Sequence, residues 1–323
     1  MKLVIQIPCL NEEASLPQTL RDLPTRIPGV DEIAVLVIDD GSEDRTSEVA
    51  RAAGVTRVYR FPQRHGLARA FAQGLQESLS MGADIIVNTD ADNQYNGSDI
   101  ERLVQPIVEK RADMVVGCRD IEGIESFSAS KKRLQRLGSW VVRGISRTRV
   151  PDATSGFRAY SREAALRLTV VSDFTYTLET IIQATKKNLA VTHVPIRTNA
   201  KTRDSRLFRG TLDYVRRSIG TMMRIYIMYQ PLKVFSWLSA LFFVPAAILI
   251  VRFLFYFFTS TGPTGHVQSV VIGVAFAIIG FLLAVLGILS DLIATNRKLL
   301  DEIVTDMRRL RFEKMDREGG GKA

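Results

Sequence analysis

Two long apolar segments near the C-terminus constrain most strongly what this chain can fold into. Residues 232–258 and 267–289 are each long enough to cross a lipid bilayer as a helix. The loop between them, residues 259–266, contains no Lys or Arg, whereas residues 201–233 and 297–322 are rich in both. Because positively charged flanks stay on the cytoplasmic side, the sequence predicts a multi-pass protein of the cell membrane with two spans and both termini in the cytoplasm.

The basic residues also indicate the class of binding partner. The net charge of +9 could serve either nucleic acid or anionic lipid headgroups. However, Lys and Arg crowd beside the apolar segments, and the sequence contains no zinc-finger spacing, aromatic ribonucleoprotein motif or helix-turn-helix pattern. We therefore expect the basic segments to face the membrane, and we expect no nucleic-acid partner.

The first two hundred residues have the pattern of an α/β domain. Short runs rich in apolar and β-branched residues alternate with polar segments of helical length, which predicts a mostly parallel sheet. The expected strands are Lys2–Pro8, Ala34–Asp40, Arg57–Phe61, Ile85–Asp90, Met114–Gly117 and Ala190–Ile196. The expected parts of the chain are this domain (1–200), amphipathic juxtamembrane helices (201–230), a transmembrane hairpin (231–293) and a cytoplasmic C-terminal helix and tail (294–323).

Asp90 and Asp92 stand one residue apart at the end of the fourth expected strand. Two carboxylates in this position can bind Mg²⁺ or Mn²⁺ and leave coordination sites for diphosphate oxygens. A bound cation would offset the charge of a departing diphosphate. The alternative is that both are ordinary turn or cap aspartates, because a lone pair of this kind occurs often by chance.

Polar residues also follow the first two strands, at Asn11 and Glu13 and at Asp39. Ligands of parallel sheets bind beyond the carboxyl ends of the strands, so these side chains indicate a nucleotide pocket in which Asp39 accepts hydrogen bonds from a base or ribose. Ser42 or Asp44 could instead cap the next helix.

The polar segments together resemble a known family. IPCLNEE, VIDDGSEDRT, HGLARAF, TDADNQY, GCR and SGFRAYSRE occur in this order, and the chain resembles an inverting family-2 glycosyltransferase of GT-A fold, which has a Rossmann-like sheet. With FTYTLETIIQA, the basic segment KTRDSRLFRG and two C-terminal spans, it is similar to the polyprenyl-phosphate glycosyltransferases, which include dolichol-phosphate mannose synthase and bacterial undecaprenyl-phosphate enzymes. The likeness covers nearly the whole chain and is weakest after Asn296.

The resemblance implies roles for individual residues. The residues implied at the nucleotide-sugar donor are Pro8, Asn11, Glu13, Asp39 and Asp90, and those at the Mg²⁺ or Mn²⁺ ion are Asp90, Asp92 and Gln94. The residues implied at the acceptor phosphate are Ser155, Arg158, Arg203, Ser205 and Arg206, and the catalytic ones are Asp92, Arg119 and Arg203. Asn93 and Tyr95 replace residues at positions that vary within the family, so the identity of the transferred sugar stays open.

The implied activity is metal-dependent, inverting transfer of a sugar from a nucleotide, with UDP preferred over GDP, to undecaprenyl or dolichyl phosphate. An ionised lipid phosphate needs no deprotonating base, and no Ser-His-Asp or Cys-His arrangement is apparent. Three other functions are considered. A processive polysaccharide synthase would need a Gln-x-x-Arg-Trp motif and a nucleotidyltransferase a Gly-rich phosphate loop, and this sequence contains neither. The third alternative is a degenerate, non-catalytic membrane scaffold.

A few residues keep open or structural interpretations. Arg252 interrupts the first span and is expected to extend to the outer headgroups. The apolar residues after the second span predict a helix that binds a partner subunit, giving a homo-oligomer, or covers its own domain. His65 could face the nucleotide or lie free on the surface, His193 is expected to be structural, and Cys9 and Cys118 are expected to be buried thiols.

Overall fold

The computed structural model describes residues 1–119, 148, 150–170, 176–199, 220, 223–224, 226–259 and 267–320. The chain divides into two units, one formed by Met1–Met222 with Ile303–Ala323 and the other by Met223–Glu302. Each is described by itself. Arg203, Ser205 and Arg206, together with most of the expected juxtamembrane helices, lie outside the described residues.

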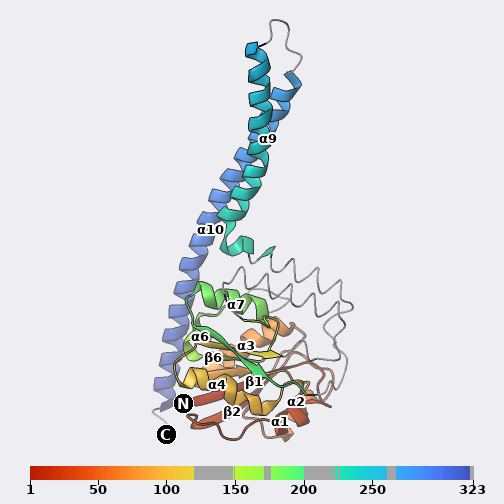
Figure 1. The fold of residues 1–323 in the computed structure, drawn as a ribbon. Helices are drawn as coiled ribbons and strands as arrows, with labels where there is room; N and C mark the ends of the chain where they lie inside the picture. The colour runs from red at the N-terminus through yellow and green to blue at the C-terminus, as the bar shows by residue number, and fades with distance from the viewer. Residues whose placement is uncertain are drawn as a thin grey trace. The chain divides into compact units, whose positions relative to one another are not determined.

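The first unit is built on a seven-stranded sheet (Figure 1). The strands are β1 (Lys2–Cys9), β2 (Glu32–Asp39), β3 (Arg57–Arg60), β4 (Ile85–Asn88), β5 (Met114–Arg119), β6 (Arg158–Ser161) and β7 (Val191–Ile196), in the order β3-β2-β1-β4-β6-β5-β7. All neighbours pair in parallel except β6, which is antiparallel to both β4 and β5. The six predicted strands and the mostly parallel sheet are confirmed. Strand β6 was missed because its four residues carry a polar side chain at each end.

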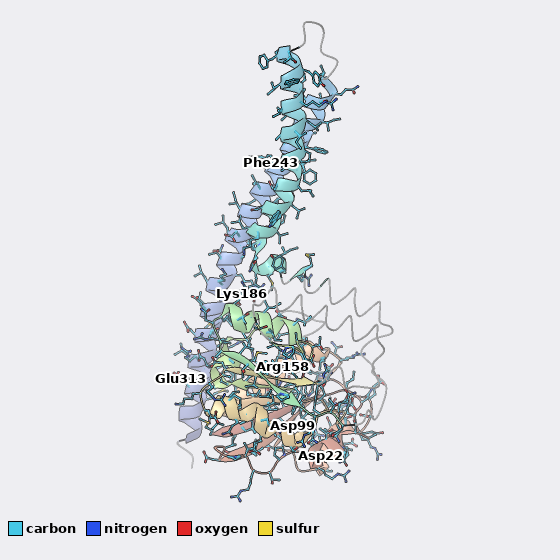
Figure 2. The ribbon with its side chains drawn as sticks, viewed as in Figure 1. Asp22, Asp99, Arg158, Lys186, Phe243 and Glu313 are labelled. Atoms are coloured by element: carbon cyan, nitrogen blue, oxygen red, sulfur yellow. The ribbon has the colours of Figure 1, made fainter. Side chains whose placement is uncertain are left out.

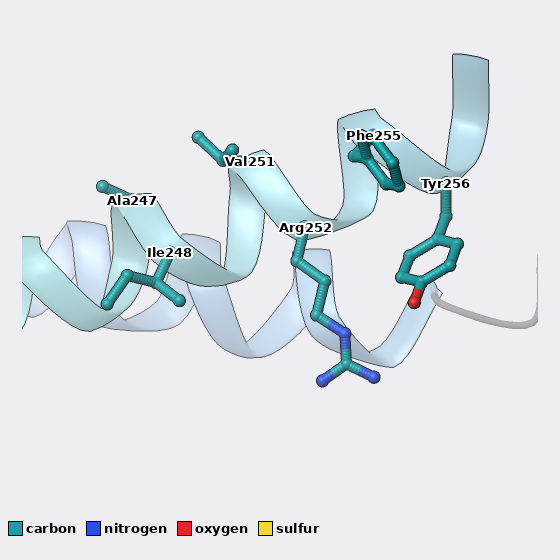
Figure 3. A pocket seen from close by; sticks show the side chains of 6 residues that line it. All are labelled: Ala247, Ile248, Val251, Arg252, Phe255 and Tyr256. Carbon is teal, nitrogen blue, oxygen red and sulfur yellow. The ribbon is translucent and has the colours of Figure 1, made fainter. Parts of the chain in front are cut away.

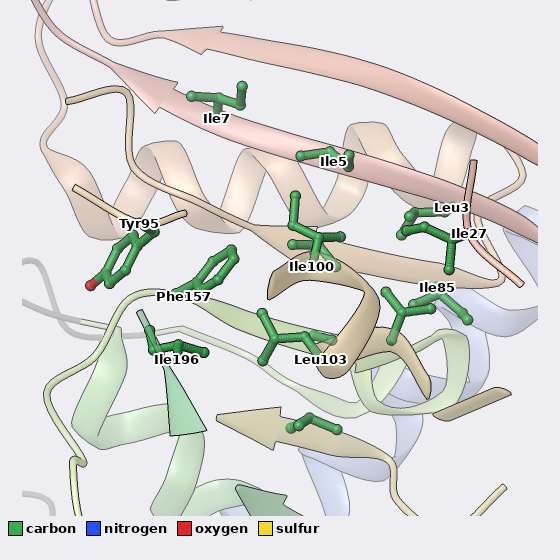
Figure 4. Close-up of a cluster of buried hydrophobic side chains, with 14 of the residues drawn as sticks. Leu3, Ile5, Ile7, Ile27, Ile85, Tyr95, Ile100, Leu103, Phe157 and Ile196 are labelled. Carbon is green, nitrogen blue, oxygen red and sulfur yellow. The ribbon is translucent and has the colours of Figure 1, made fainter. Parts of the chain in front are cut away.

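Helices cover both faces of the sheet. They are α1 (Leu16–Arg21), α2 (Thr46–Ala52), α3 (Leu67–Ser80), the 3₁₀ turn η1 (Gly97–Asp99), α4 (Ile100–Val108), α6 (Arg162–Arg167) and α7 (Thr177–Lys186). On one face, Ile100 and Leu103 of α4 pack among Ile5 of β1, Ile85 of β4 and Phe157 (Figure 4). Burial on both faces explains why the central strands are almost continuously apolar.

Strand β1 shows how the sheet opens toward the polar loops. Its pairing with β4 ends at Gln6 and Asn88, while its pairing with β2 continues to Cys9 and Asp39. Proline has no N–H to donate and is avoided in the middle of a sheet. Pro8 lies beyond the last residue paired with β4, at the point where β1 and β4 separate.

The second unit contains α9 (Pro231–Thr259) and most of α10 (Val267–Gly320). Both helices are long and apolar enough to cross a membrane. They approach closely at three glycines seven residues apart, because a Cβ on Gly273, Gly280 or Gly287 would lie 2.8–3.2 Å from the nearest side-chain atom of α9. At the middle glycine, the Ser239 hydroxyl donates a hydrogen bond of 2.8 Å to the Gly280 carbonyl. Small residues that admit a close backbone approach are typical of helix packing in membranes.

The C-terminal part of α10 belongs to the first unit and packs on α6. Arg309 donates two hydrogen bonds of 2.9 Å to the Glu163 carboxylate, and Arg308 donates to the carbonyl oxygens of Leu166 and Leu168. Phe312 is buried on the same part of the helix. Of the two alternatives for this helix, covering its own domain is therefore observed.

The glycine contacts predict a specific sensitivity of the second unit. Gly280→Leu forces α9 and α10 apart, because its side chain would meet the Phe243 ring and would separate Ser239 from its acceptor. We expect a loss of roughly 1–3 kcal/mol, as for other overpacked sites, measured as a lower melting temperature in detergent. Ala275→Leu, on an exposed position of the same helix, is the matched control and should melt like wild type. Equal melting of both variants would show that the close approach contributes no stability.

Candidate active site

The loops after β1 and β2 are tied together at the carboxyl ends of these strands. Asn11 has a left-handed backbone conformation (φ 56°), and its side-chain oxygen accepts a 2.8 Å hydrogen bond from the Glu43 amide. The Glu13 carboxylate accepts from the Arg45 amide at 3.1 Å and lies 3.5 Å from Nε of the same arginine. The structure thus brings together the two loops that the sequence analysis assigned to a nucleotide pocket.

Asp39 and Asp40, at the end of β2, bind donors of the neighbouring loops. The Asp39 side chain is fully buried, with one oxygen accepting from the Ser42 amide at 2.8 Å and the other from the Ser47 hydroxyl. The Asp40 carboxylate accepts from the amides of His65 and Gly66 at 2.7 and 2.8 Å. Both carboxylates therefore organise the surrounding loops. The role of Asp39 in accepting hydrogen bonds from a base or ribose stays a prediction, to which these internal contacts are added.

Asp90 and Asp92 lie directly after β4 and are partly buried. Burial, together with the neighbouring charge of Asp92, raises the pKa of Asp90 to about 7, although Arg119 acts in the opposite direction. Burial also raises the pKa of Asp92. Both side chains remain partly exposed. Their carboxylates can therefore reach a ligand while their negative charges are poorly solvated.

A buried network of polar side chains holds the chain beneath these carboxylates. The Asn88 side-chain amide donates to the Gly156 carbonyl and to the Tyr176 hydroxyl, both at 2.9 Å, and accepts from Gln6 at 2.9 Å. The Tyr176 ring stacks on Phe71 with centroids 3.9 Å apart. Gly156 permits the close approach, because a Cβ there would lie 2.7 Å from the Tyr176 hydroxyl and 3.3 Å from Asp90.

A hard divalent cation fits this pair of carboxylates. Within the described part of the chain, no hydrogen bond or ion pair reaches the Asp90 carboxylate, whose raised pKa indicates that it lacks charge compensation. The described residues contain no cluster of three or more potential metal ligands. A two-carboxylate site suits Mg²⁺ or Mn²⁺, which keep positions for water and phosphate oxygens. The position of the Gln94 side chain relative to such an ion stays a prediction, although its backbone amide donates to Asp92 at 3.1 Å.

Arg119, at the end of β5, supplies positive charge next to the carboxylates. Its Nε and Nη2 donate to the two oxygens of Asp152 at 2.7 and 3.2 Å, and Nη2 also contacts the Thr154 hydroxyl at 3.2 Å. Nη1 makes no hydrogen bond to a described residue. Burial alone would raise the pKa of Asp152, but pairing with Arg119 keeps this pKa below its usual value. The fixed guanidinium therefore keeps its charge near Asp90 and Asp92, and its Nη1 has no partner among the residues that the structure describes.

Arg158 and Ser155 are both buried side chains of the first unit, where Figure 2 labels Arg158. The Arg158 guanidinium donates to the carbonyl oxygens of Ala153, Ser155 and Thr177 at 2.7 Å. The Ser155 side chain is also fully buried. The role of these two residues at the acceptor phosphate stays a prediction. The hydrogen bonds of the guanidinium to three carbonyl oxygens and to the Thr180 hydroxyl tie β6 to the start of α7.

The loop after the carboxylates is clamped by residues that follow β7. Asn199 donates to the carbonyl oxygens of Asn93 and Gln94, both at 2.9 Å. Arg197 binds the buried Asp99 carboxylate through its amide at 2.7 Å and through Nη2 at 2.9 Å. Sequence reasoning missed these contacts because the partners are about a hundred residues apart.

The remaining sequence expectations have mixed outcomes. Cys9 and Cys118 are buried free thiols, as predicted. His193 is exposed on the edge strand β7, so the expectation of a satisfied structural histidine is wrong. His65 is exposed and its ring packs against Phe61, with centroids 4.7 Å apart.

Comparison with known proteins identifies the fold and the family. The chain is similar to glucosyl-3-phosphoglycerate synthase from Mycobacterium tuberculosis, solved with Mn²⁺, UDP-glucose and phosphoglyceric acid, with a TM-score of 0.54 and 24% identity over 70% of this chain and 79% of that one. This is the GT-A fold. The glycosyl transferase family 2 profile matches residues 4–169. The chain belongs to this family and is a glycosyltransferase.

Two relatives with named activities are similar to this chain. An undecaprenyl-phosphate mannosyltransferase from Micrococcus luteus is 34% identical over 166 residues, which cover 50% of this chain and 66% of the relative. A UDP-N-acetylglucosamine–dolichyl-phosphate N-acetylglucosaminyltransferase from Methanococcus voltae is 29% identical over 217 residues, which cover 59% of this chain and 83% of the relative.

The pKa of Asp90 predicts how cation binding depends on pH. Protons compete with the cation, so Mn²⁺ affinity should fall about tenfold per pH unit below the pKa of about 7 and level off above it. Between about pH 4 and 7, the folded, metal-free protein keeps a proton on Asp90 that the unfolded chain has already released. The free energy of unfolding of the metal-free protein therefore decreases as the pH rises through this range. Electron paramagnetic resonance titration with Mn²⁺ measures the affinity, with Asp90→Asn as the non-binding control. Constant affinity from pH 8 to 5.5 would exclude Asp90 as a ligand.

The contact between Arg119 and Asp152 predicts a second effect. Asp152→Asn keeps the shape but removes the charge that orients the guanidinium, so turnover should fall at least about tenfold, whereas Mn²⁺ affinity should change less than about threefold. Thr154→Val, which removes one contact to the same arginine, is the control and should have a smaller effect. Steady-state release of nucleotide measures turnover, and melting curves verify folding. Unchanged turnover in Asp152→Asn would mean that the orientation of Arg119 does not matter.

Proposed function

We propose that this enzyme transfers a sugar from a nucleotide sugar to a polyprenyl phosphate, such as undecaprenyl or dolichyl phosphate, with inversion at the anomeric carbon. The observation that carries the proposal is the pair Asp90 and Asp92 beside the fixed Arg119, in a chain that also has two helices apolar enough to cross a membrane. Two relatives carry names with undecaprenyl-phosphate or dolichyl-phosphate acceptors, which supports the acceptor class.

The charges of the site suit this chemistry. When bound, Mg²⁺ or Mn²⁺ would be held by Asp90 and Asp92 and would offset the charge of the departing nucleotide diphosphate. Asp152 holds Arg119 so that Nη1 can donate to a phosphate oxygen without reorganising. The acceptor phosphate is ionised near pH 7, so no residue has to remove a proton from it. The protein then contributes mainly the alignment of the two substrates and the compensation of their charges.

Location and partners complete the proposal. The positive flanks of the apolar helices favour a catalytic unit and both termini in the cytoplasm, where nucleotide sugars are available. A UDP-sugar is the preferred donor class, in line with the name of the Methanococcus voltae relative. Arg203, Ser205 and Arg206 remain the proposed ligands of the lipid phosphate. Self-association through α10 also stays a prediction.

The function is tested with a substrate panel. Purified protein is incubated with undecaprenyl phosphate, Mg²⁺ and a set of UDP- and GDP-sugars, and the lipid-linked product is measured by mass spectrometry. Asp92→Asn should lower transfer by two orders of magnitude or more, because the amide loses the charge that binds the cation while keeping the shape. Asn93→Asp, which adds a carboxylate one residue further on, is a control for the position of the charge and should not rescue the Asp92→Asn variant.

Two results would contradict the proposal. Substantial turnover of Asp92→Asn with Mg²⁺ or Mn²⁺ would remove the metal assignment while leaving the acceptor class open. Nucleotide release without any lipid-linked product, across all donors, would show that the acceptor is not a polyprenyl phosphate.

A further inference from the structure

The segment from Asn88 to Tyr95, which carries both candidate carboxylates, is closed at its two ends by one residue, Gly156. At the first end, the Asn88 side-chain amide donates to the Gly156 carbonyl at 2.9 Å. At the other end, the Tyr95 hydroxyl accepts a hydrogen bond of 3.2 Å from the Gly156 amide. Gly156 therefore holds both the start and the end of the loop that follows β4.

Gly156 also lies close to the Asp90 carboxylate. A Cβ placed on Gly156 would be 3.3 and 3.5 Å from the two oxygens of Asp90. Gly156 is buried, and no described residue makes a hydrogen bond or ion pair to this carboxylate. The orientation of the Asp90 side chain therefore depends on what packs around it, and the backbone of Gly156 forms one side of that packing.

Tyr95 is held from two directions. Its side chain is 6% exposed, and its ring stacks on Phe157 with centroids 4.9 Å apart and planes 12° apart. Its backbone forms an isolated antiparallel bridge with Thr198, beyond β7. Figure 4 shows the Tyr95 and Phe157 rings side by side, with the hydroxyl pointing away from the apolar cluster. Ring and backbone together fix the point at which the hydroxyl meets the Gly156 amide.

The Tyr95 hydroxyl carries no charge near neutral pH. Burial raises the pKa of Tyr95 to about 12, although the charge of Arg119 acts in the opposite direction. Replacing Tyr95 by Phe therefore changes no charge and keeps the ring, but it leaves the buried Gly156 amide without its acceptor. An effect of this replacement on a bound cation must then arise from the positions of the carboxylates.

We propose that Tyr95 is a positioning residue of the candidate active site, whose hydroxyl holds Gly156 against Asp90 and so fixes the orientation of the Asp90 carboxylate toward a divalent cation. Partners behind a metal ligand orient it, and their loss typically lowers metal affinity by about 10- to 100-fold. Tyr95 acts through Gly156 and not through a contact with the cation. The inference rests on the proposed function, because it takes Asp90 as a ligand of the cation.

Titration of the full chain with Mn²⁺ tests this role in the absence of nucleotide and lipid. Electron paramagnetic resonance measures the Mn²⁺ affinity of wild type and of Tyr95→Phe at a pH above the pKa of Asp90. We expect the variant to bind Mn²⁺ about tenfold more weakly than wild type. Equal affinities would overturn the proposal.

Two control variants separate this role from the loss of any hydroxyl group and from lower stability. Tyr256→Phe makes the same chemical change on α9, where Tyr256 lies one helical turn from Arg252 (Figure 3). Leu79→Ala opens a cavity at the C-terminal end of α3, which precedes the start of β4, whereas the carboxylates follow the end of β4.

Leu79→Ala should melt at a lower temperature than wild type, and both controls should bind Mn²⁺ with wild-type affinity while folded. Weaker binding by either control would contradict the proposal, because the effect would then not depend on the contact between Tyr95 and Gly156.

Turnover at increasing Mn²⁺ concentration gives a second readout. A residue that only positions a cation ligand loses its effect once the cation site is saturated, whereas a residue that contacts the substrate keeps it. Nucleotide release by Tyr95→Phe should therefore come within about twofold of wild type at saturating Mn²⁺. Turnover that stays low at saturation would refute the positioning role.

The outcome remains distinct from that of the proposed function. The Mn²⁺ titration needs neither a sugar nucleotide nor a polyprenyl phosphate, so its result holds for any acceptor. If wild-type protein binds no Mn²⁺, the cation assignment and the positioning role are both overturned. If wild type and Tyr95→Phe bind Mn²⁺ equally while wild type forms the lipid-linked sugar, the positioning role alone is lost.

Discussion

The partly buried carboxylate of Asp90 is the constraint around which the catalytic unit is arranged. Two adjacent negative charges, those of Asp90 and Asp92, lie where water is scarce, and the raised pKa of Asp90 reflects that cost. Burying charge is unfavourable unless it is compensated. The protein compensates only in part, through Arg119, whose guanidinium is in turn held by Asp152. The remaining imbalance is the reason for proposing a divalent cation at this edge of the sheet.

The same constraint explains the polar interior below the site. An Asn side chain in a buried strand costs free energy unless its hydrogen bonds are satisfied, and Asn88 satisfies them with Gln6, Gly156 and Tyr176. These contacts join β1, β4 and the beginning of α7. Arg158 fastens α7 to the residues before β6 in the same manner. Buried polar groups bonded to one another in this way favour one arrangement of the backbone, which holds the carboxylates of the following loop in place.

Much of the fold followed from local patterns. Six strands could be predicted because buried parallel strands are continuous apolar runs between polar segments, and both apolar helices were evident from length and composition. Strand β6 could not be predicted, since a four-residue strand beginning with Arg158 has no such pattern and exists only because β4 and β5 pair with it. The complete burial of Arg158, Ser155 and Asp39 could not be predicted for a related reason. Burial and hydrogen-bond partners depend on distant segments, not on residue type.

The sequence by itself determined the α/β class, the mostly parallel sheet and the grouping of polar residues at one sheet edge, because strand periodicity and parallel connections leave few alternatives. It also determined the two apolar helices. Only the tertiary structure decided which charged groups face the site and which hold the framework. Arg119 and Arg158 are both arginines of the sheet, but Arg119 is paired with Asp152 and lies near Asp90, whereas Arg158 is buried and donates to three carbonyl oxygens and a hydroxyl. That difference arises because folding brings different distant segments next to each arginine, and a charged side chain pairs with the partners that lie nearest to it.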